Sequence, residues 1–229
     1  MAKERTLKTF RGIATALGAV MMSAGVAAAA DYSEPVMTPY SGGFYVTLQG
    51  GYMMLDDPSV SFISGGTVNA AVDVDNGYRL GGAIGYDFND NVALEFETSY
   101  IHTGVNAIYT GLGGALAPGD GSAITLMGNA VIGNDYGPWR PYVGAGIGAA
   151  LVSLDVDFMS DIDDSDWAFS AQAFAGVDYQ LSDRASIGGR YRFQHIGSTD
   201  YADGNGNPVG LGGLNLHSFE VVLKFKFGG

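Results

Sequence analysis

Much of the chain after residue 43 alternates between apolar and polar side chains with a period of two. In the segment NVALEFETSY, Asn91–Tyr100, the apolar Leu94 and Phe96 alternate with Glu95 and Glu97. This alternation predicts a β-strand with one apolar and one polar face. In a soluble sandwich the polar face meets water. In a membrane barrel the apolar face meets lipid, and the polar face lines the interior.

Alternating runs of this kind recur along the rest of the chain, and each is long enough to cross a bilayer as a tilted strand. There are eight: Phe44–Met54, Gly77–Phe88, Asn91–Thr103, Ala123–Gly133, Arg140–Ser153, Asp166–Leu181, Ala185–Ile196 and Asn215–Phe227. Short turns (Asn89-Asp90, NDYGPW and SDR) alternate with long polar segments near 55–76, 104–122, 154–165 and 197–214. This order of connections predicts an up-and-down barrel with both termini at one end.

Sorting each run by parity leaves no Asp, Glu, Lys or Arg on the apolar face, which carries Phe and Tyr towards the strand ends as membrane barrels do. The polar face carries five basic and five acidic residues: Arg79, Asp87, Glu95, Glu97, Asp178, Arg190, Arg192, Glu220, Lys224 and Lys226. A closed interior requires such a match, because an unpaired buried charge is costly. The pattern therefore predicts an all-β fold, an eight-stranded antiparallel up-and-down transmembrane β-barrel whose narrow lumen is filled by side chains. A soluble sandwich is the alternative.

The first 30 residues have the features of a secretory signal peptide. A basic start precedes the apolar run Ile13–Val26, and Ala28 to Ala30 supplies the small residues of a cleavage site before Asp31. Cleavage between Ala30 and Asp31 is expected, with a retained N-terminal anchor as the alternative. The predicted organisation is therefore a signal peptide (1–30), a periplasmic lead-in (31–42) and a barrel domain (43–229).

Composition narrows the choice of function. Residues 31–229 contain seven basic and 23 acidic residues, a net charge of −16, which is unsuited to binding nucleic acid. The chain has no cysteine, which excludes disulfides and Cys-ligated metals. Charged residues are only 15% of the chain, fewer than in an ordinary soluble domain, where they are about a quarter. No cofactor is expected.

Several segments carry a family resemblance: SGGFYVTLQGGY, GGAIGYDF, VALEFETSY, WRPYVGAGIGAAL, FAGVDYQLSDRASIGGRYRF and HSFEVVLKFKF. Together they resemble the small OmpA-like outer-membrane β-barrels, most closely the porin-like surface-antigen barrels of alphaproteobacteria. The resemblance covers residues 43–227. It implies a barrel in the cell outer membrane with both termini periplasmic, surrounded by lipid and lipopolysaccharide and inserted by the barrel assembly machinery. Such barrels usually end in Phe, whereas here Gly228-Gly229 follow Phe227.

The segment LHSFE places His217, Ser218 and Glu220 close together and suggests a lipid hydrolase. Neighbouring residues of a strand point to opposite faces, so His217 cannot activate Ser218. No catalysis is expected.

Two charged groups leave alternatives open. Six aspartates between the fifth run and the start of the sixth suit either a solvated surface loop or a weak cation site that bridges to lipopolysaccharide phosphates. They are Asp155, Asp157, Asp161, Asp163, Asp164 and Asp166. The interior residues Glu95, Glu97, Arg190 and Arg192 suit either a structural salt-bridge network or an ion path.

The function expected from these features is a monomeric structural barrel that supports envelope integrity and acts as a surface antigen. A narrow channel for small solutes or ions, and an adhesin that binds through its long connections, are the alternatives.

Overall fold

The computed structural model describes residues 42–56, 59–63, 67–74, 76–110, 113–156, 162–202 and 208–227. These residues form one antiparallel sheet of twelve strand segments and contain no helix that could span a membrane. In chain order the segments are β1 (Gly43–Leu55), β2 (Ser59–Ile63), β3 (Thr67–Val74), β4 (Gly77–Asp87), β5 (Val92–Thr110), β6 (Gly113–Gly133), β7 (Trp139–Val156), β8 (Ile162–Gln180), β9 (Ala185–Ile196), β10 (Thr199–Ala202), β11 (Pro208–Leu211) and β12 (Leu214–Phe227). The predicted cleavage site between Ala30 and Asp31 lies outside the described residues.

The eight long strands close into a barrel. Their order around the ring is β1, β4, β5, β6, β7, β8, β9 and β12, and the pairing of β12 with β1 completes the ring. Every neighbouring pair is antiparallel, which confirms the predicted eight-stranded fold. Closure leaves none of these eight strands with an unpaired edge in the central part of the barrel.

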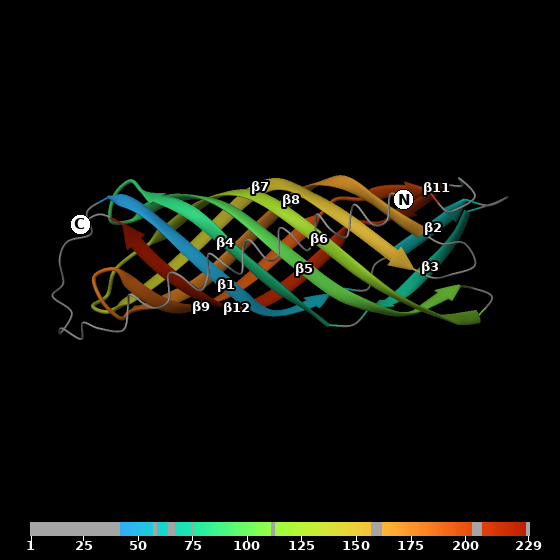
Figure 1. The fold of residues 1–229 in the computed structure, drawn as a ribbon, viewed down its shortest axis with the longest axis horizontal. Coiled ribbons are helices and arrows are strands. Elements are labelled where there is room, and N and C mark those ends of the chain that lie inside the picture. Colours follow the sequence, from blue (N-terminus) through green and yellow to red (C-terminus); the bar gives the residue numbers. More distant parts are fainter. Residues whose placement is uncertain are drawn as a thin grey trace, which may run out of the picture. The chain divides into compact units, whose positions relative to one another are not determined.

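The strands wind around the barrel axis (Figure 1). Directly paired residues can be followed once around the ring from Tyr45 through Gly85, Glu95, Asn129, Gly146, Gln172, Gln194 and Leu216 to Leu55. The path therefore returns to β1 ten residues beyond its start. A stagger of this size requires tilted strands, about 35–45° from the axis in barrels.

The two ends of the barrel differ. One end, called here the turn end, carries the tight connections 88–91, 134–138 and 181–184. In the first of these, Asn89 Oδ1 accepts hydrogen bonds at 2.9 Å from the backbone amides of Asn91 and Val92. In the second, Gly137 has a φ of 64°, which glycine adopts without strain.

The opposite end, called here the extension end, carries strands that continue well past the length needed to cross a bilayer. β5 to β8 are 19, 21, 18 and 19 residues long, about twice the length of a membrane-spanning strand. The short strands β2, β3 and β11 lie at this end (Figure 1). They are joined to the barrel through the pairing of β3 with β5.

The prediction that the long connections are loops was therefore wrong in part. The segments 104–122 and 154–165 are mostly continuations of β5 to β8, and 55–76 and 197–214 contain β2, β3, β10 and β11. Beyond a bilayer both faces of a strand can meet water, so no period-two pattern is needed there. The backbone hydrogen bonds between neighbouring strands still continue there, because a strand that ended earlier would leave amide and carbonyl groups unpaired.

The barrel is apolar outside and polar inside. Phe96 is 62% exposed on the outer face, whereas the next residue, Glu97, is fully buried in the lumen. The same contrast holds along the other long strands, where the outer face exposes large side chains such as Phe44, Ile147 and Phe169. This distribution inverts that of a soluble protein and requires an apolar solvent around the barrel.

Candidate functional site

The lumen gathers the charged side chains of the barrel. Nine of the ten charged residues predicted to line it are buried, and Lys226 is half-buried at the turn end. They come from five strands, with Arg79 and Asp87 on β4, Glu95 and Glu97 on β5, Asp178 on β8, Arg190 and Arg192 on β9, and Glu220, Lys224 and Lys226 on β12. Because inward residues alternate along each strand, these groups reach the lumen at different heights along the barrel.

Four fully buried side chains form an ion cluster at the centre: Arg79, Glu97, Arg192 and Glu220. Arg192 Nη1 lies 2.5 Å from Glu97 Oε1, and Arg192 Nε lies 2.9 Å from Glu220 Oε1. Arg79 lies 3.8 Å from Glu97 and 3.7 Å from Glu220. Two positive charges thus balance two negative charges, which offsets the cost of removing them from water.

Neutral polar side chains complete the hydrogen bonds of this cluster. Asn129 Nδ2 donates to Glu97 Oε2 at 3.1 Å, and Gln172 Nε2 donates to Asn129 Oδ1 at 2.7 Å. On the other side, Ser218 Oγ donates to Glu220 Oε1 at 2.7 Å, and Arg79 donates to Gln194. The acceptors and donors of the cluster are therefore tied to two more strands, β6 and β8, which fixes the side chains in place.

Between the cluster and the turn end, aromatic rings fill the lumen. Tyr45 OH donates to Glu95 Oε1 at 2.9 Å, and the Lys224 ammonium lies 3.8 Å from the centre of the Tyr45 ring. The Arg190 guanidinium lies 4.4 Å from the centre of the Phe174 ring and donates to Tyr142 OH at 3.1 Å. These contacts combine ion–aromatic attraction with close packing in a narrow space.

Two strand glycines make room for these rings. A Cβ atom at Gly85 would collide with the Tyr45 ring, and one at Gly144 would collide with the Phe174 ring. A side chain at either position would push its ring out of place. Glycine on these strands thus allows close packing at two defined positions.

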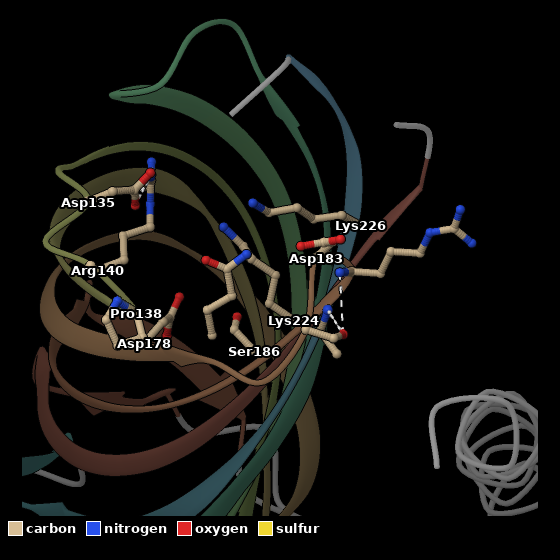
Figure 2. Close-up of a pocket in the computed structure, with 13 residues that line it drawn as sticks. Asp135, Pro138, Arg140, Asp178, Asp183, Ser186, Lys224 and Lys226 are labelled. Carbon is tan, nitrogen blue, oxygen red and sulfur yellow. Dashed lines mark hydrogen bonds and ion pairs between the residues drawn. The ribbon is translucent and has the colours of Figure 1, made fainter. Parts of the chain in front are cut away.

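A small pocket opens at the turn end of the lumen. Figure 2 shows the mixture of basic and acidic side chains around it, with Asp135 next to Arg140 and with Asp178 and Lys224 deeper in the lumen. Arg140 Nη1 donates to Asp135 Oδ1 at 2.8 Å. The cavity measures about 30 Å³, room for a few water molecules and no larger solute.

Buried polar atoms without a hydrogen bond among the described side chains concentrate in this half of the lumen. They include Thr47 Oγ1, Gln49 Nε2, Glu95 Oε2 and Asp178 Oδ1. Buried polar groups of this kind usually bind water. The turn-end half therefore has the chemistry of a hydrated vestibule. In the central cluster the Nε atoms of Arg79 and Arg192 also lack a hydrogen bond, but each lies beside Glu220 Oε1, at 3.7 and 2.9 Å.

At the extension end the lumen becomes apolar. On seven of the eight long strands, the inward side chains next to the polar set are buried and apolar: Met53, Ile101, Ala123, Ala150, Val152, Ala168, Ile196 and Leu216. We refer to these eight residues as the apolar layer. A buried apolar segment of this kind opposes the passage of ions, because it offers no group to replace their hydration.

Sequence reasoning missed the apolar layer, although the inward parity of Met53, Ile101, Ile196 and Leu216 could have revealed it. Sorting residues by polarity obscured the signal, since apolar residues at inward positions looked like breaks in the alternation. Asn129 and Gln172 also lie at inward parity, but parity alone does not identify their hydrogen-bond partners.

The suggested hydrolase residues are separated by the barrel wall. Ser218 is buried in the lumen next to Glu220, whereas His217 lies on the outer face, where its Nδ1 atom is 2.7 Å from Tyr191 OH. The two side chains therefore cannot exchange a proton.

The backbone brings part of the acidic segment together without forming a metal site. Asp155 on β7 pairs with Asp163 on β8, and Asp164 and Asp166 lie along the same strand as Asp163. Asp157 and Asp161 lie outside the described residues. Among the residues that the structure describes, no three His, Asp or Glu side chains are arranged to hold a metal ion.

The comparisons with known proteins agree with this architecture. The family described as "Outer membrane protein beta-barrel domain" matches residues 14–227. Curated proteins of Brucella abortus (strain 2308) and Brucella suis biovar 1 (strain 1330), each described as uncharacterized, are 27% identical over 195 residues, which cover 66% of this chain and 69% of theirs.

Two solved structures share the fold. Neisserial surface protein A is 19% identical, with a TM-score of 0.53, and the match covers 82% of this chain and all of that protein. The outer membrane protein OprG from Pseudomonas aeruginosa is 17% identical, with a TM-score of 0.54, and the match covers 83% of this chain and 99% of that protein. At these identities the likeness concerns the fold alone.

Proposed function

The chain belongs to the outer membrane protein β-barrel domain family, and on that premise we propose that it is a structural barrel of the cell envelope with a closed lumen and no catalysis. In this proposal the protein supports envelope integrity and presents its extension end as a surface antigen. Its outer face meets lipid, as expected for a barrel of the outer membrane.

The observation that carries this proposal is the double filling of the lumen. The ion cluster of Arg79, Glu97, Arg192 and Glu220 occupies the centre, and the apolar layer lies between it and the extension end. An ion that crossed the barrel would have to displace buried salt bridges and then pass a buried apolar segment. Both features argue against the channel alternative.

The absence of catalysis in this proposal is supported by the wall between Ser218 and His217. The buried carboxylates of Glu220, Glu97 and Glu95 are used in hydrogen bonds with Ser218, Asn129 and Tyr45, respectively. Their chemistry is that of structural acceptors.

For the orientation, we propose that the turn end and both termini face the periplasm and that the extension end faces the outside. Outer-membrane barrels have short periplasmic turns and longer external connections. The described β1 and β12 strands also begin and end at the turn end, at Gly43 and Phe227. In this proposal the signal peptide directs export and is cleaved between Ala30 and Asp31, and the barrel assembly machinery then inserts the protein as a monomer.

The strand extensions favour adhesion as a second function. β5 to β8 and the sheet formed by β2, β3, β10 and β11 form a hydrogen-bonded platform in place of separate loops. An ordered platform loses less conformational entropy on binding a partner than free loops do.

A complementation experiment separates the two functions. A strain lacking the gene is expected to take up a hydrophobic dye that intact outer membranes exclude. Both the wild-type protein and a variant whose β5–β6 hairpin is shortened by deleting residues 105–118 should restore exclusion. Loss of surface binding in the shortened variant would support adhesion. Unchanged dye uptake in the deletion strain would contradict the envelope-integrity role.

A further inference from the structure

Positive charge is distributed unevenly over the barrel. The only Lys and Arg residues in 31–229 are Arg79, Arg140, Arg184, Arg190, Arg192, Lys224 and Lys226. Arg79, Arg190, Arg192 and Lys224 are buried in the lumen, and the other three lie at the turn end. No Lys or Arg is therefore left for the outer wall near the extension end.

The three histidines of the chain occupy that region of the wall. His102 on β5, His195 on β9 and His217 on β12 all have outward parity, opposite to the inward Ile101, Ile196 and Leu216 of the apolar layer. They are the only side chains there that can become cationic near neutral pH. We refer to these three residues as the histidine belt.

Aromatic side chains flank the histidine belt. His102 lies 5.3 Å from the Tyr78 ring and 6.4 Å from the Tyr100 ring, measured between centroids. His217 lies 5.1 Å from the Phe193 ring and 6.1 Å from the Tyr191 ring. Tyr and Trp concentrate at the headgroup level of membranes, so these contacts locate the belt at a lipid–water interface.

The polar groups that face each imidazole are few. His102 Nε2 is 3.8 Å from Asp120 Oδ1 on β6, and His217 Nε2 is 3.7 Å from Asp56 Oδ2 beside the end of β1. His217 Nδ1 also contacts Tyr191 OH on β9. Tyr78 on β4 and Tyr100 on β5 are the titratable groups beside His102.

His195 has a different environment. Its Nδ1 atom lies 2.8 Å from Asn215 Oδ1 on β12, and across β8 it pairs with the small, uncharged Ala171. Asn215 Oδ1 can accept a hydrogen bond from the Nδ1–H group of His195 both when the imidazole is neutral and when it is charged. Nε2 makes no hydrogen bond within the described residues, so protonation would give it an N–H group directed away from the protein.

We propose that the histidine belt binds anionic, phosphate-bearing lipid headgroups of the outer leaflet when its imidazoles are protonated. The proposal rests on the orientation given above, which puts the extension end outside. Lysine and arginine ordinarily supply the cations for such headgroups. Here only histidine can do so, and contact with anionic lipid therefore depends on pH. Asp56 and Asp120 compete with the lipid for two of the three imidazoles.

Brominated lipids provide a direct test, since bromine quenches tryptophan fluorescence on contact. Trp167 lies exposed on β8 towards the extension end, and Trp139 lies exposed beside the turn at 134–138. The variant W139F leaves Trp167 as the reporter for the belt. The variant W167F leaves Trp139 as the reporter for the turn end, where Arg140, Arg184 and Lys226 stay charged.

Each variant is refolded into phosphatidylcholine vesicles that contain either brominated phosphatidylglycerol or brominated phosphatidylcholine. With Trp167, the ratio of anionic to zwitterionic quenching should rise about five-fold when the pH is lowered from about 7.5 to about 5.5, because protonated imidazoles attract anionic headgroups. With Trp139, the ratio should exceed one at both pH values and change little. A flat ratio for Trp167 would overturn the proposal.

Histidine substitutions test whether the histidine belt causes the pH-dependent rise in the quenching ratio. H102Q, H195Q and H217Q combined in the W139F background should abolish the rise, and D56N with D120N should increase it by removing the competing carboxylates. If the triple variant fails to show heat-modifiable migration, the exposed H195Q alone should lower the rise. A rise that persists in both histidine variants would contradict the proposal.

The orientation is tested separately. Labelling of an engineered cysteine at Ser165, exposed on β8 beyond Trp167 at the extension end, by an impermeant maleimide on intact cells should succeed. If it fails while the quenching result holds, the proposed orientation is wrong and the lipid contact is assigned to the other leaflet.

Discussion

Glu97 on β5 and Arg192 on β9 meet across the lumen, with 2.5 Å between Glu97 Oε1 and Arg192 Nη1 and both side chains fully buried. Three strands separate β5 from β9 in each direction around the ring. The pair thus spans the lumen and joins opposite walls of the barrel, and it provides the first prediction.

E97Q should lower the free energy of unfolding by about 3–5 kcal/mol, because it removes one partner of a buried ion pair and strands the other. Combining E97Q with R192Q should restore part of that loss. The measurement is a double-mutant cycle on urea midpoints in detergent. D183N, at an exposed turn residue, is the matched control and should change stability by less than about 1 kcal/mol. Additive losses in the cycle would mean that the two side chains do not act as a pair.

The packing of Tyr45 against Gly85 gives a second prediction. G85A should destabilise the barrel by about 1–3 kcal/mol, because the added methyl group displaces the Tyr45 ring. Y45L in the same chain should recover part of the loss by removing the ring atoms that collide. G189A is the control, since a Cβ atom there meets nothing within 4 Å. Equal urea midpoints for G85A and G189A would contradict the packing described.

The outer face gives a third prediction. L94R should cost about 2–4 kcal/mol, because Leu94 is half-exposed on the outer wall, where an arginine meets hydrocarbon. L181R, at the turn end, should cost about 1 kcal/mol or less, because its charge can reach the headgroups. Refolding titrations into vesicles measure both. A cost for L181R equal to that for L94R would mean that the lipid-facing band is misplaced.

The hydrated vestibule gives a fourth prediction, which the lack of native cysteine makes simple to test. S186C, in the small pocket at the turn end, should react with a small water-soluble thiol reagent in the folded protein. S99C and S170C, which are buried beside the ion cluster and the apolar layer, should stay unreacted until the barrel is unfolded. Rapid labelling of S170C in the folded state would show that water reaches the apolar layer.

Much of the barrel could be predicted from the chain alone. The period of two assigned Glu97, Arg192 and Glu220 to the inner face, because each lies at inward parity on its strand. Parity does not give height along the axis, which depends on the stagger between strands. For this reason the sequence could name the charged set and could not say that Arg192, and not Lys224, meets Glu97.

Glu95 illustrates the same limit. The sequence suggested a basic partner for it, and the structure gives it the Tyr45 hydroxyl. Polarity does not assign Tyr45 to the inner face, because an aromatic side chain at inward parity departs from the polar pattern. The strand extensions escaped prediction for a related reason: residues such as Val105 to Thr110 lie beyond the part of the strand where one face must be apolar.

The closed lumen is the central claim, and single-channel recording in a planar bilayer tests it most directly. Refolded wild-type protein, with insertion verified by heat-modified migration and a general porin as the positive control, should give no conductance steps. A matched variant that thins the apolar layer and breaks the ion cluster (I101G, I196G, L216G and R192G together) should give steps or raised leak if it inserts. Reproducible conductance steps from the wild-type barrel would contradict the account, because ions would then pass both the Glu97–Arg192 pair and the apolar layer.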